Sequence, residues 1–322
     1  MTASPSMITG PGAPRRTRQK SLGRRMIEHR WHYLFLVPML VLFVLFTVWP
    51  MIASWYYSFF DWDGLGPAED FLGVQNYTEV LTSPRFWNAF KNSFIFSLVA
   101  IFVQMPLTLI MAIILNNPRL RGRNLYRLFL FLPVVTTTAV VGIVFAVMLD
   151  PSGGFVNEVL QSTGLIKDPI NFLGSEGSAL PTVLIIDLWK GFGITLIYWL
   201  AALQTIPAEI YEAAKVDGAG ARQVLTNITV PMLVPIAIVI LLLTFQSSMN
   251  PFDLIQATTK AGPNYATDVV ATYIYRYAFD PEMAAPRYGF ACAAGVVFGM
   301  FTLILTLIQA PLLRRRYTKG VA

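Results

Sequence analysis

Two charged residues lie inside an apolar run of the sequence: Asp187 and Lys190, in the stretch IIDLWKGFGITLIYW. A charge at the centre of a membrane helix costs about 2.5–3.5 kcal/mol or more, so such a residue usually marks function. A carboxylate and an ammonium three residues apart on a helix can also pair, which lowers this cost. Two interpretations follow: the residues contact a polar solute, or they form a self-neutralising pair near one end of a span.

Residues for catalysis or metal binding are few. His29 and His32 have no other ligand residues near them, so we interpret them as interfacial residues. Cys292 is the only cysteine, which excludes an internal disulfide and a thiolate cluster. The sequence has no G-x-x-x-x-G-K-[ST] loop, no convincing Ser/His/Asp set and no paired carboxylates in its spans. We predict no catalytic residue, no metal and no cofactor bound by this chain.

The elements that must position Asp187 and Lys190 are membrane helices. The 322 residues are 55% hydrophobic and 13% charged, whereas a soluble domain carries about 25% charged residues. Long apolar segments can cross a hydrocarbon core of about 30 Å as helices, which satisfy their own backbone hydrogen bonds. The predicted spans are 33–56, 90–115, 125–149, 180–203, 231–249 and 289–313. We predict an all-α polytopic membrane protein, with a disordered basic tail over 1–30 and a transmembrane domain over 31–322.

The basic residues predict the orientation. With the N-terminus inside, 17 of the 24 lysines and arginines fall in the tail, the two inner loops and the C-terminus. The positive-inside rule therefore favours a multi-pass protein of the cytoplasmic membrane with both termini in the cytoplasm. The net charge of +6 then reflects topology and attraction to anionic lipid, and no nucleic-acid partner is predicted. A short helix around Phe155–Leu160 is expected at the outer interface.

The second inner loop, 205–231, is punctuated like a helix–turn–helix. Pro207 suits the first helical position, and Gly218 sits where a left-handed C-cap would lie. Glu209 lies toward the N-terminal end and Lys215 toward the C-terminal end, as the helix dipole favours. We predict a helix over 207–217 that projects from the membrane and is followed by a second helix. One face of the first helix carries the small and apolar side chains of Ile210, Ala213, Ala214 and Asp217.

This loop resembles the EAA loop of ABC importer permeases. The pattern is Glu212-Ala213-Ala214, three residues, Gly218, nine residues, then Ile228-x-Val230-Pro231, with valine where the family usually has leucine. The stretches LAALQTIPAEIYEAAKVDGA, FDLIQATTKAGP and TDVVATYIYRYAF resemble the carbohydrate-uptake branch, which includes the maltose permease. The resemblance covers about 33–313 and implies six transmembrane helices in a type I ABC importer permease fold.

The resemblance also implies roles for residues and partners. The first helix of the loop would dock on a dimeric cytoplasmic ATPase, which binds the ATP and Mg that this chain does not. The docking residues implied are Glu212, Ala213, Ala214, Asp217 and Gly218. A second, related permease subunit and an extracytoplasmic solute-binding protein would complete the transporter. The substrate path implied consists of Asp187, Lys190, Gly191, Thr244 and Ser248, with Gln246 and Asn250 as nearby polar candidates.

The resemblance implies ATP-driven import of a mono-, di- or oligosaccharide. The residues of the implied path suit this substrate, because sugars need hydrogen-bonding groups and an apolar or aromatic face. Import of glycerol-3-phosphate or its diesters by the same machinery is the alternative. An ion-coupled secondary transporter would need intramembrane coupling carboxylates, for which Asp187 is the one clear candidate. A membrane-embedded enzyme would need a cluster of His, Asp or Cys, which is not visible. We expect Thr136–Thr138 to hydrogen-bond to neighbouring helices.

Overall fold

The computed structural model describes residues 30–281 and 285–317, and within these ranges the regular structure is helical apart from one isolated bridge between Phe60 and Phe71. The predicted disordered tail lies almost wholly outside the described residues. The chain divides into two compact units, 1–53 and 54–322. In the first unit, α2 (Arg30–Phe43) and the π-helix η1 (Val44–Val48) lead into α3 (Trp49–Tyr57). Together they provide a candidate span over Leu34–Tyr57, close to the predicted 33–56.

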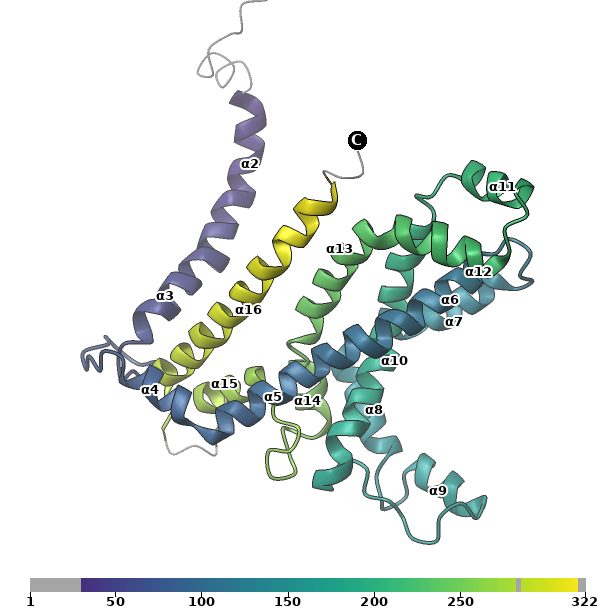
Figure 1. The fold of residues 1–322 in the computed structure, drawn as a ribbon. Coiled ribbons are helices and arrows are strands. Elements are labelled where there is room, and N and C mark those ends of the chain that lie inside the picture. The colour runs from purple at the N-terminus through teal and green to yellow at the C-terminus, as the bar shows by residue number, and fades with distance from the viewer. Residues whose placement is uncertain (1–29, 282–284, 318–322) are drawn as a thin grey trace, which may run out of the picture. The chain divides into compact units, whose positions relative to one another are not determined.

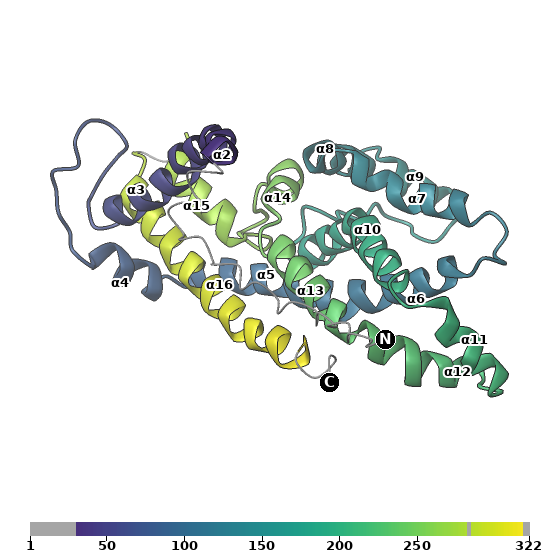
Figure 2. The ribbon, with the colours of Figure 1, turned by 90° about the horizontal axis from the view of Figure 1, so that it is seen from above.

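The second unit contains four more candidate spans that match predicted segments, with ends that differ by a few residues. They are Pro84–Asn116, Glu176–Leu203, the apolar part of Ala221–Thr258, and Tyr288–Gln309. The first of these consists of α5 (Pro84–Val99), η2 (Ala100–Gln104) and α6 (Met105–Asn116). The others are α10 (Glu176–Leu203), α13 (Val230–Ser248) and α16 (Tyr288–Tyr317). Figure 2 shows α13 between α10 and α16, both of which it contacts.

The predicted segment 125–149 is not one helix. It forms α7 (Arg123–Val135) and α8 (Thr138–Met148), which are bent by 96° relative to each other. Thr136 and Thr137 have extended backbones, with ψ of 147° and 144°. Pro133 cannot donate a backbone hydrogen bond, and the Thr136 hydroxyl donates to the Pro133 carbonyl at 2.8 Å. The chain therefore breaks inside a segment predicted as one helix, and the pair counts as a sixth span only if both helices are taken together.

Three π-helices interrupt the long helices, and each ends two residues before a proline. Pro50 follows η1, Pro106 follows η2, and Pro231 follows η3 (Leu225–Thr229). A proline lacks an N–H, and its ring collides with the carbonyl four residues back. Widening the preceding turn to i→i−5 hydrogen bonds moves that carbonyl aside, which keeps the helix continuous where an α-helix would break.

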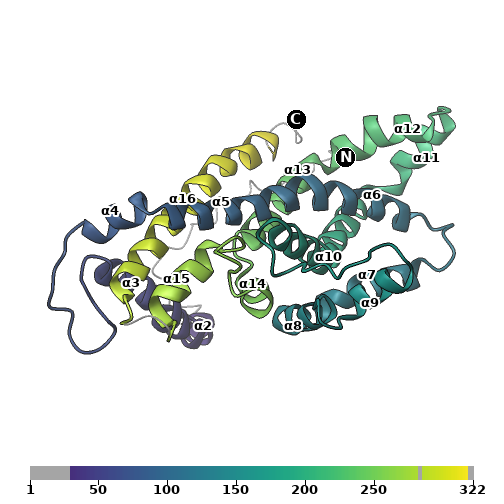
Figure 3. The same ribbon diagram turned by 90° about the horizontal axis from the view of Figure 1, so that it is seen from below.

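Short helices close the two ends of the second unit. Figure 1 shows α9 (Phe155–Ser162) and α11 (Ala208–Val216) beyond opposite ends of α10. The helix predicted around Phe155–Leu160 is thus confirmed as an element. At the α9 end, α14 (Phe252–Thr258) packs against α8 (Figure 3). At the same end, α15 (Val270–Phe279) packs against α16.

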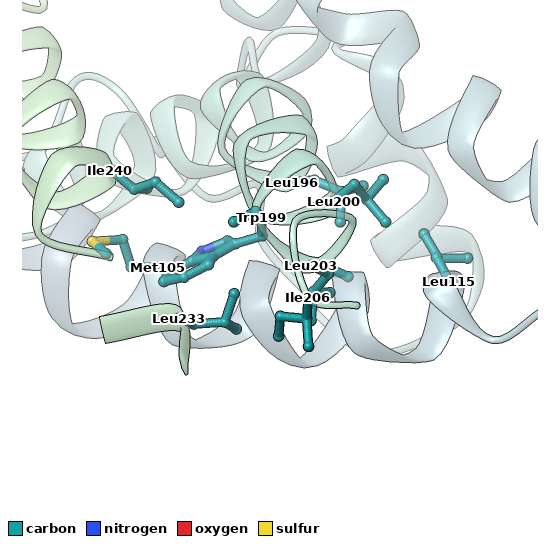
Figure 4. Close-up of a cluster of buried hydrophobic side chains, with 11 residues drawn as sticks. Met105, Leu115, Leu196, Trp199, Leu200, Leu203, Ile206, Leu233 and Ile240 are labelled. Atoms are coloured by element: carbon teal, nitrogen blue, oxygen red, sulfur yellow. The ribbon is translucent and has the colours of Figure 1, made fainter. Parts of the chain in front are cut away.

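Three clusters of buried side chains hold the second unit together. One joins α6, α10 and α13 around Trp199, which is 3% exposed (Figure 4). A second joins α5, α8, α10 and α14 around Val183 and Leu254. The third joins α4 (Gln75–Thr82), α5, α15 and α16 around Tyr273. Because α5 and α6 form one helix that contributes to all three, that helix sets the positions of α10 and α13.

The loop 259–269 between α14 and α15 is anchored by a buried charge. The Asp268 side chain is fully buried, with a carboxylate oxygen 2.6 Å from a guanidinium nitrogen of Arg276. Thr272 donates to the other oxygen at 2.7 Å. Burial raises the pKa of Asp268, although Arg276 and Thr272 act in the opposite direction. Four non-glycine residues of this loop have positive φ, a conformation that costs about 1–3 kcal/mol each: Lys260, Ala261, Asn264 and Tyr265.

Side chains from α5 and α15 hold this strained loop in place. Asn92 donates to the carbonyls of Ala266 and Asp268 at 2.9 and 2.8 Å. The Arg276 guanidinium also lies 4.3 Å from the centre of the Tyr265 ring. The loop is therefore fixed to α15 by the ion pair between Asp268 and Arg276 and by the contact of Arg276 with the Tyr265 ring.

Candidate functional site

A cavity of about 480 Å³ lies where α10 and α13 meet η2 and the broken pair α7–α8. Polar side chains enter it from α10 and α13, and apolar walls are provided by residues such as Val134, Ile194 and Leu243. A cavity of this volume is typical of sites for small molecules. The arrangement can hydrogen-bond a hydroxylated solute on one side and cover its apolar surface on another.

The structure brings together all five residues predicted for the substrate path. Asp187, Lys190 and Gly191 come from α10, and Thr244 and Ser248 come from α13. Gln246 also lines the cavity, whereas Asn250, which follows the end of α13, does not. Their contact with substrate stays a prediction.

Of the two interpretations of Asp187 and Lys190, the close ion pair is not observed. In the described part of the chain, ion pairs shorter than 4.0 Å join Asp268 to Arg276 and Glu79 to Arg287, but not Asp187 to Lys190. Both side chains line the cavity instead. Both residues are therefore available to a solute.

Thr244 has an unsatisfied hydroxyl. The residue is 3% exposed, and its Oγ1 has no hydrogen-bond partner among the described residues. Leaving such a group unpaired costs about 1–3 kcal/mol. A bound solute or a change of conformation could give this hydroxyl a hydrogen-bond partner. Of the polar residues of α13, Thr244 therefore has the strongest structural support for contact with a solute.

Sequence reasoning missed four residues of the cavity that carry polar groups: Gln104, Thr195, Tyr198 and Ser247. Gln104 is an amide inside an apolar span and could have been noticed for that reason alone. The direction of its side chain could not have been predicted, because the π-turn η2 changes the face of the helix on which Gln104 lies. The threonines also differ from expectation: Thr136 bonds within its own helix, and Thr138 lines the cavity.

Gly191 has a steric reason to be glycine. A Cβ built there would lie 3.0 Å from Gln104 Nε2 and 3.3 Å from Oε1. The Gln104 amide donates to the Gly191 carbonyl at 2.9 Å, so it approaches the α10 backbone closely. A side chain at residue 191 would push this amide away from α10.

The predicted helix of the second loop is present as α11, Ala208–Val216. Pro207 lies one residue before the helix rather than at its first position, with an extended ψ of 137°. Gly218 has φ +74°, as a left-handed C-cap requires. The Ala219 N–H donates to the Ala214 carbonyl at 2.9 Å and closes the helix end as in a Schellman motif. After this turn, α12 (Ala221–Val224) leads through η3 into α13.

The tip of this loop exposes a mixed surface. Val216 is 88% exposed, which is unusual for an apolar residue, and Glu212 and Ala213 are also exposed. Ala214 is 7% exposed and faces the loop's own interior. The Tyr211 hydroxyl lies 3.3 Å from Thr229 Oγ1, which ties α11 to η3. On the face predicted from the sequence, Ala213 and Asp217 are therefore open to a partner, and Ala214 supports the fold of the loop.

Comparison with known proteins gives consistent results. The family model described as "Binding-protein-dependent transport system inner membrane component" matches residues 104–319. The probable ABC transporter permease protein YurN of Bacillus subtilis is 33% identical over 86% of this chain and 94% of its own length. The lactose transport system permease protein LacF of Rhizobium radiobacter is 31% identical over 93% of this chain and 99% of its own.

Solved structures are also similar. A chain of a bacterial ABC transporter involved in the import of the acidic polysaccharide alginate has a TM-score of 0.79 and 28% identity, covering 91% of this chain and 98% of that one. The alginate transporter in complex with an alginate pentasaccharide-bound periplasmic protein matches with the same TM-score.

Proposed function

Because the chain belongs to the family of binding-protein-dependent transport system inner membrane components, we propose that its cavity passes a sugar across the membrane. The protein is an ABC importer permease of the inner membrane, multi-pass and without catalytic activity of its own. The observation that carries the choice of substrate is the lining of the cavity. Asp187, Thr244 and Ser248 offer oxygens to a polyol beside apolar walls and Tyr198.

The relatives support the same class of substrate. One relative is named as a lactose transport system permease protein, and one similar structure is that of a transporter involved in the import of alginate. Glycerol-3-phosphate or its diesters are the second candidate, because Lys190 could attract a phosphate. The Asp187 carboxylate lines the same cavity and opposes the attraction of Lys190 for an anion. The two opposite charges and the hydroxyls of Thr244 and Ser248 favour a hydroxyl-rich solute over a phosphate.

The exposed tip of α11 is the proposed contact with a separate ATPase dimer. Glu212, Ala213, Asp217 and Gly218 would form the contact, with Ala214 holding the helix in place. Because Tyr211 ties this helix to η3 and thereby to α13, movement of α11 would reach Thr244 and Ser248 through one connected segment. A second permease subunit would supply the rest of the path, and a solute-binding protein would deliver the sugar at the α9 end. ATP and Mg would be held by the ATPase.

The proposed orientation can be tested with single cysteines. In a Cys292→Ala background, Ser152→Cys beyond α8 should react with a membrane-impermeant thiol reagent added to intact cells. Val216→Cys on α11 should react only after the membrane is permeabilised. Both positions are exposed, so a difference in labelling reports sidedness. Labelling of both cysteines in intact cells would contradict the assignment of α11 to the cytoplasm.

Replacing the α13 hydroxyls tests the sugar path. Thr244→Val and Ser248→Ala should each weaken transport at subsaturating sugar by about 5- to 150-fold, the equivalent of a lost buried hydrogen bond of about 1–3 kcal/mol. ATP hydrolysis stimulated by the loaded binding protein should largely survive, because the loop at α11 is unchanged. The measurement is initial uptake into proteoliposomes containing the complete transporter.

Thr306→Val is the matched control for these variants. Thr306 lies in the span of α16, does not line the cavity, and bonds to the carbonyl of Thr302 at 2.8 Å. We expect wild-type uptake from this variant. Wild-type rates from both Thr244→Val and Ser248→Ala would move the sugar contacts away from α13 and onto the partner permease.

A further inference from the structure

The amide of Gln104 is held rigidly in the cavity wall. Its Nε2 donates to the Gly191 carbonyl at 2.9 Å and to Thr195 Oγ1 at 2.7 Å, and the residue is 4% exposed. An amide nitrogen has two hydrogens, and these two bonds use both of them. Because a carbonyl can only accept, the group that faces Gly191 must be the NH₂, which settles the orientation of the amide.

The remaining functional atom of this side chain is its carbonyl oxygen. Gln104 Oε1 has no hydrogen-bond partner in the described part of the chain, and Gln104 lines both this cavity and a neighbouring one of about 330 Å³. The amide cannot rotate to present a donor instead, since that would turn Oε1 toward the Gly191 carbonyl. The free atom of Gln104 is therefore a fixed acceptor that cannot donate.

The position of Gln104 follows from the backbone. The π-turn η2 ends at this residue, two positions before Pro106, and α10 and α13 both pack against it. Thr195 donates to the Gly191 carbonyl at 3.4 Å, so the amide, the hydroxyl and the carbonyl form one directed network. Networks of this kind position an amide more firmly than a single bond does.

We propose that Gln104 is a specificity-determining residue, whose Oε1 accepts a hydrogen bond from one hydroxyl of the transported sugar. The inference rests on the proposed function and adds to it a residue outside α10 and α13. A fixed acceptor favours a solute group that carries a hydrogen and disfavours an ether, fluorine or phosphate oxygen at the same place. Selectivity, more than overall rate, is the property that Gln104 controls.

Gln104→Met tests this with monodeoxyfluoro analogues, because fluorine replaces a hydroxyl in size but cannot donate. The complete transporter is reconstituted and screened with glucose, lactose, maltose and alginate oligosaccharides, and the sugar it imports is then compared with its analogues at saturating binding protein. Wild type should import the analogue fluorinated at one position about tenfold more slowly or worse. Gln104→Met should lose this preference at that position and keep the preferences at all others.

Two further variants separate selectivity from folding. Thr195→Ser keeps the acceptor that anchors the amide and should keep the wild-type preference. Gly191→Ala keeps Gln104 but displaces its amide, so it should weaken the preference at the same position even if Gln104→Met fails to assemble. A purely structural Gln104 would instead slow every sugar equally in both Gln104→Met and Gly191→Ala, and that result would overturn the proposal.

The experiment distinguishes failure of the proposed sugar transport from failure of the role assigned to Gln104. If the wild-type transporter imports none of the saccharides, the proposed function fails and this assignment fails with it. If it imports a sugar but Gln104→Met, or Gly191→Ala in its place, retains every wild-type preference, only the assignment of Gln104 fails.

Discussion

Gly218→Arg should abolish uptake, while the protein still inserts into the membrane in normal amount. Gly218 is exposed at the tip of the α11 loop, with φ +74°, and a Cβ there would meet nothing within 4 Å. Arginine therefore causes no collision within this chain, and its intrinsic cost is the left-handed backbone, about 1–2 kcal/mol. A long cation at a surface that must fit closely into a partner would prevent docking. The measurements are uptake in cells and recovery of the ATPase with the purified complex.

Gly164 provides a matched control at the other end of the unit. It follows α9 with φ +72°, is exposed, and would also meet nothing within 4 Å. The Leu165 N–H closes that helix on the Leu160 carbonyl at 3.0 Å, as Ala219 does on Ala214 at 2.9 Å. Gly164→Arg carries the same backbone strain far from α11, so we expect normal insertion and normal recovery of the ATPase with the complex. Normal uptake and ATPase recovery from Gly218→Arg, or equal loss of the ATPase from both variants, would show that α11 is not the docking element.

Asp268→Ala should strongly destabilise the second unit. The buried carboxylate neutralises Arg276, whose side chain is 14% exposed, and removing one partner of a buried pair costs about 3–5 kcal/mol. Arg276 would keep its contact with the Tyr265 ring, and the strained loop 259–269 would lose the carboxylate that binds both Arg276 and Thr272. The measurement is the apparent unfolding temperature of the purified complex in detergent.

The exposed pair Glu79–Arg287 is the control for this variant. Its two N···O distances are 2.7 Å, but the side chains are 45% and 35% exposed. Arg287 lowers the pKa of Glu79 by hydrogen bonding, yet exposed pairs contribute only about 0–1 kcal/mol. Glu79→Gln should therefore change the unfolding temperature little. The double variant Asp268→Ala, Arg276→Met should recover part of the loss; no recovery would mean that the carboxylate acts through the loop backbone rather than through the charge pair.

The sequence predicted the positions of most helices well, and the directions of their side chains less well. Apolar length predicted the spans, and proline and glycine chemistry predicted α11 and its C-cap within one residue. The break at Thr136–Thr137 was missed because hydropathy stays high across it, and hydropathy does not report backbone direction. Asp187 was noticed as a charge inside a span, and Thr244 was implied by the family resemblance; the structure places both in one cavity. Gln104 is also a polar residue in a span, but its place depends on the contact between η2 and α10, which connects residues about ninety positions apart.

The π-turn η2 has a further effect on the helix that contains Gln104. A π-turn acts like the insertion of one residue, and one residue corresponds to about 100° of rotation around a helix. The side chains after η2 are therefore rotated about the helix axis, relative to those before it, from where an unbroken α-helix would place them. Before η2, Phe86 and Phe96 enter the clusters near α15 and α14, whereas Ala112 and Leu115 after it enter the cluster near α13. Deleting one residue from 100–104 would remove this rotation and turn one set of side chains away from its contacts, although the composition of the helix would hardly change.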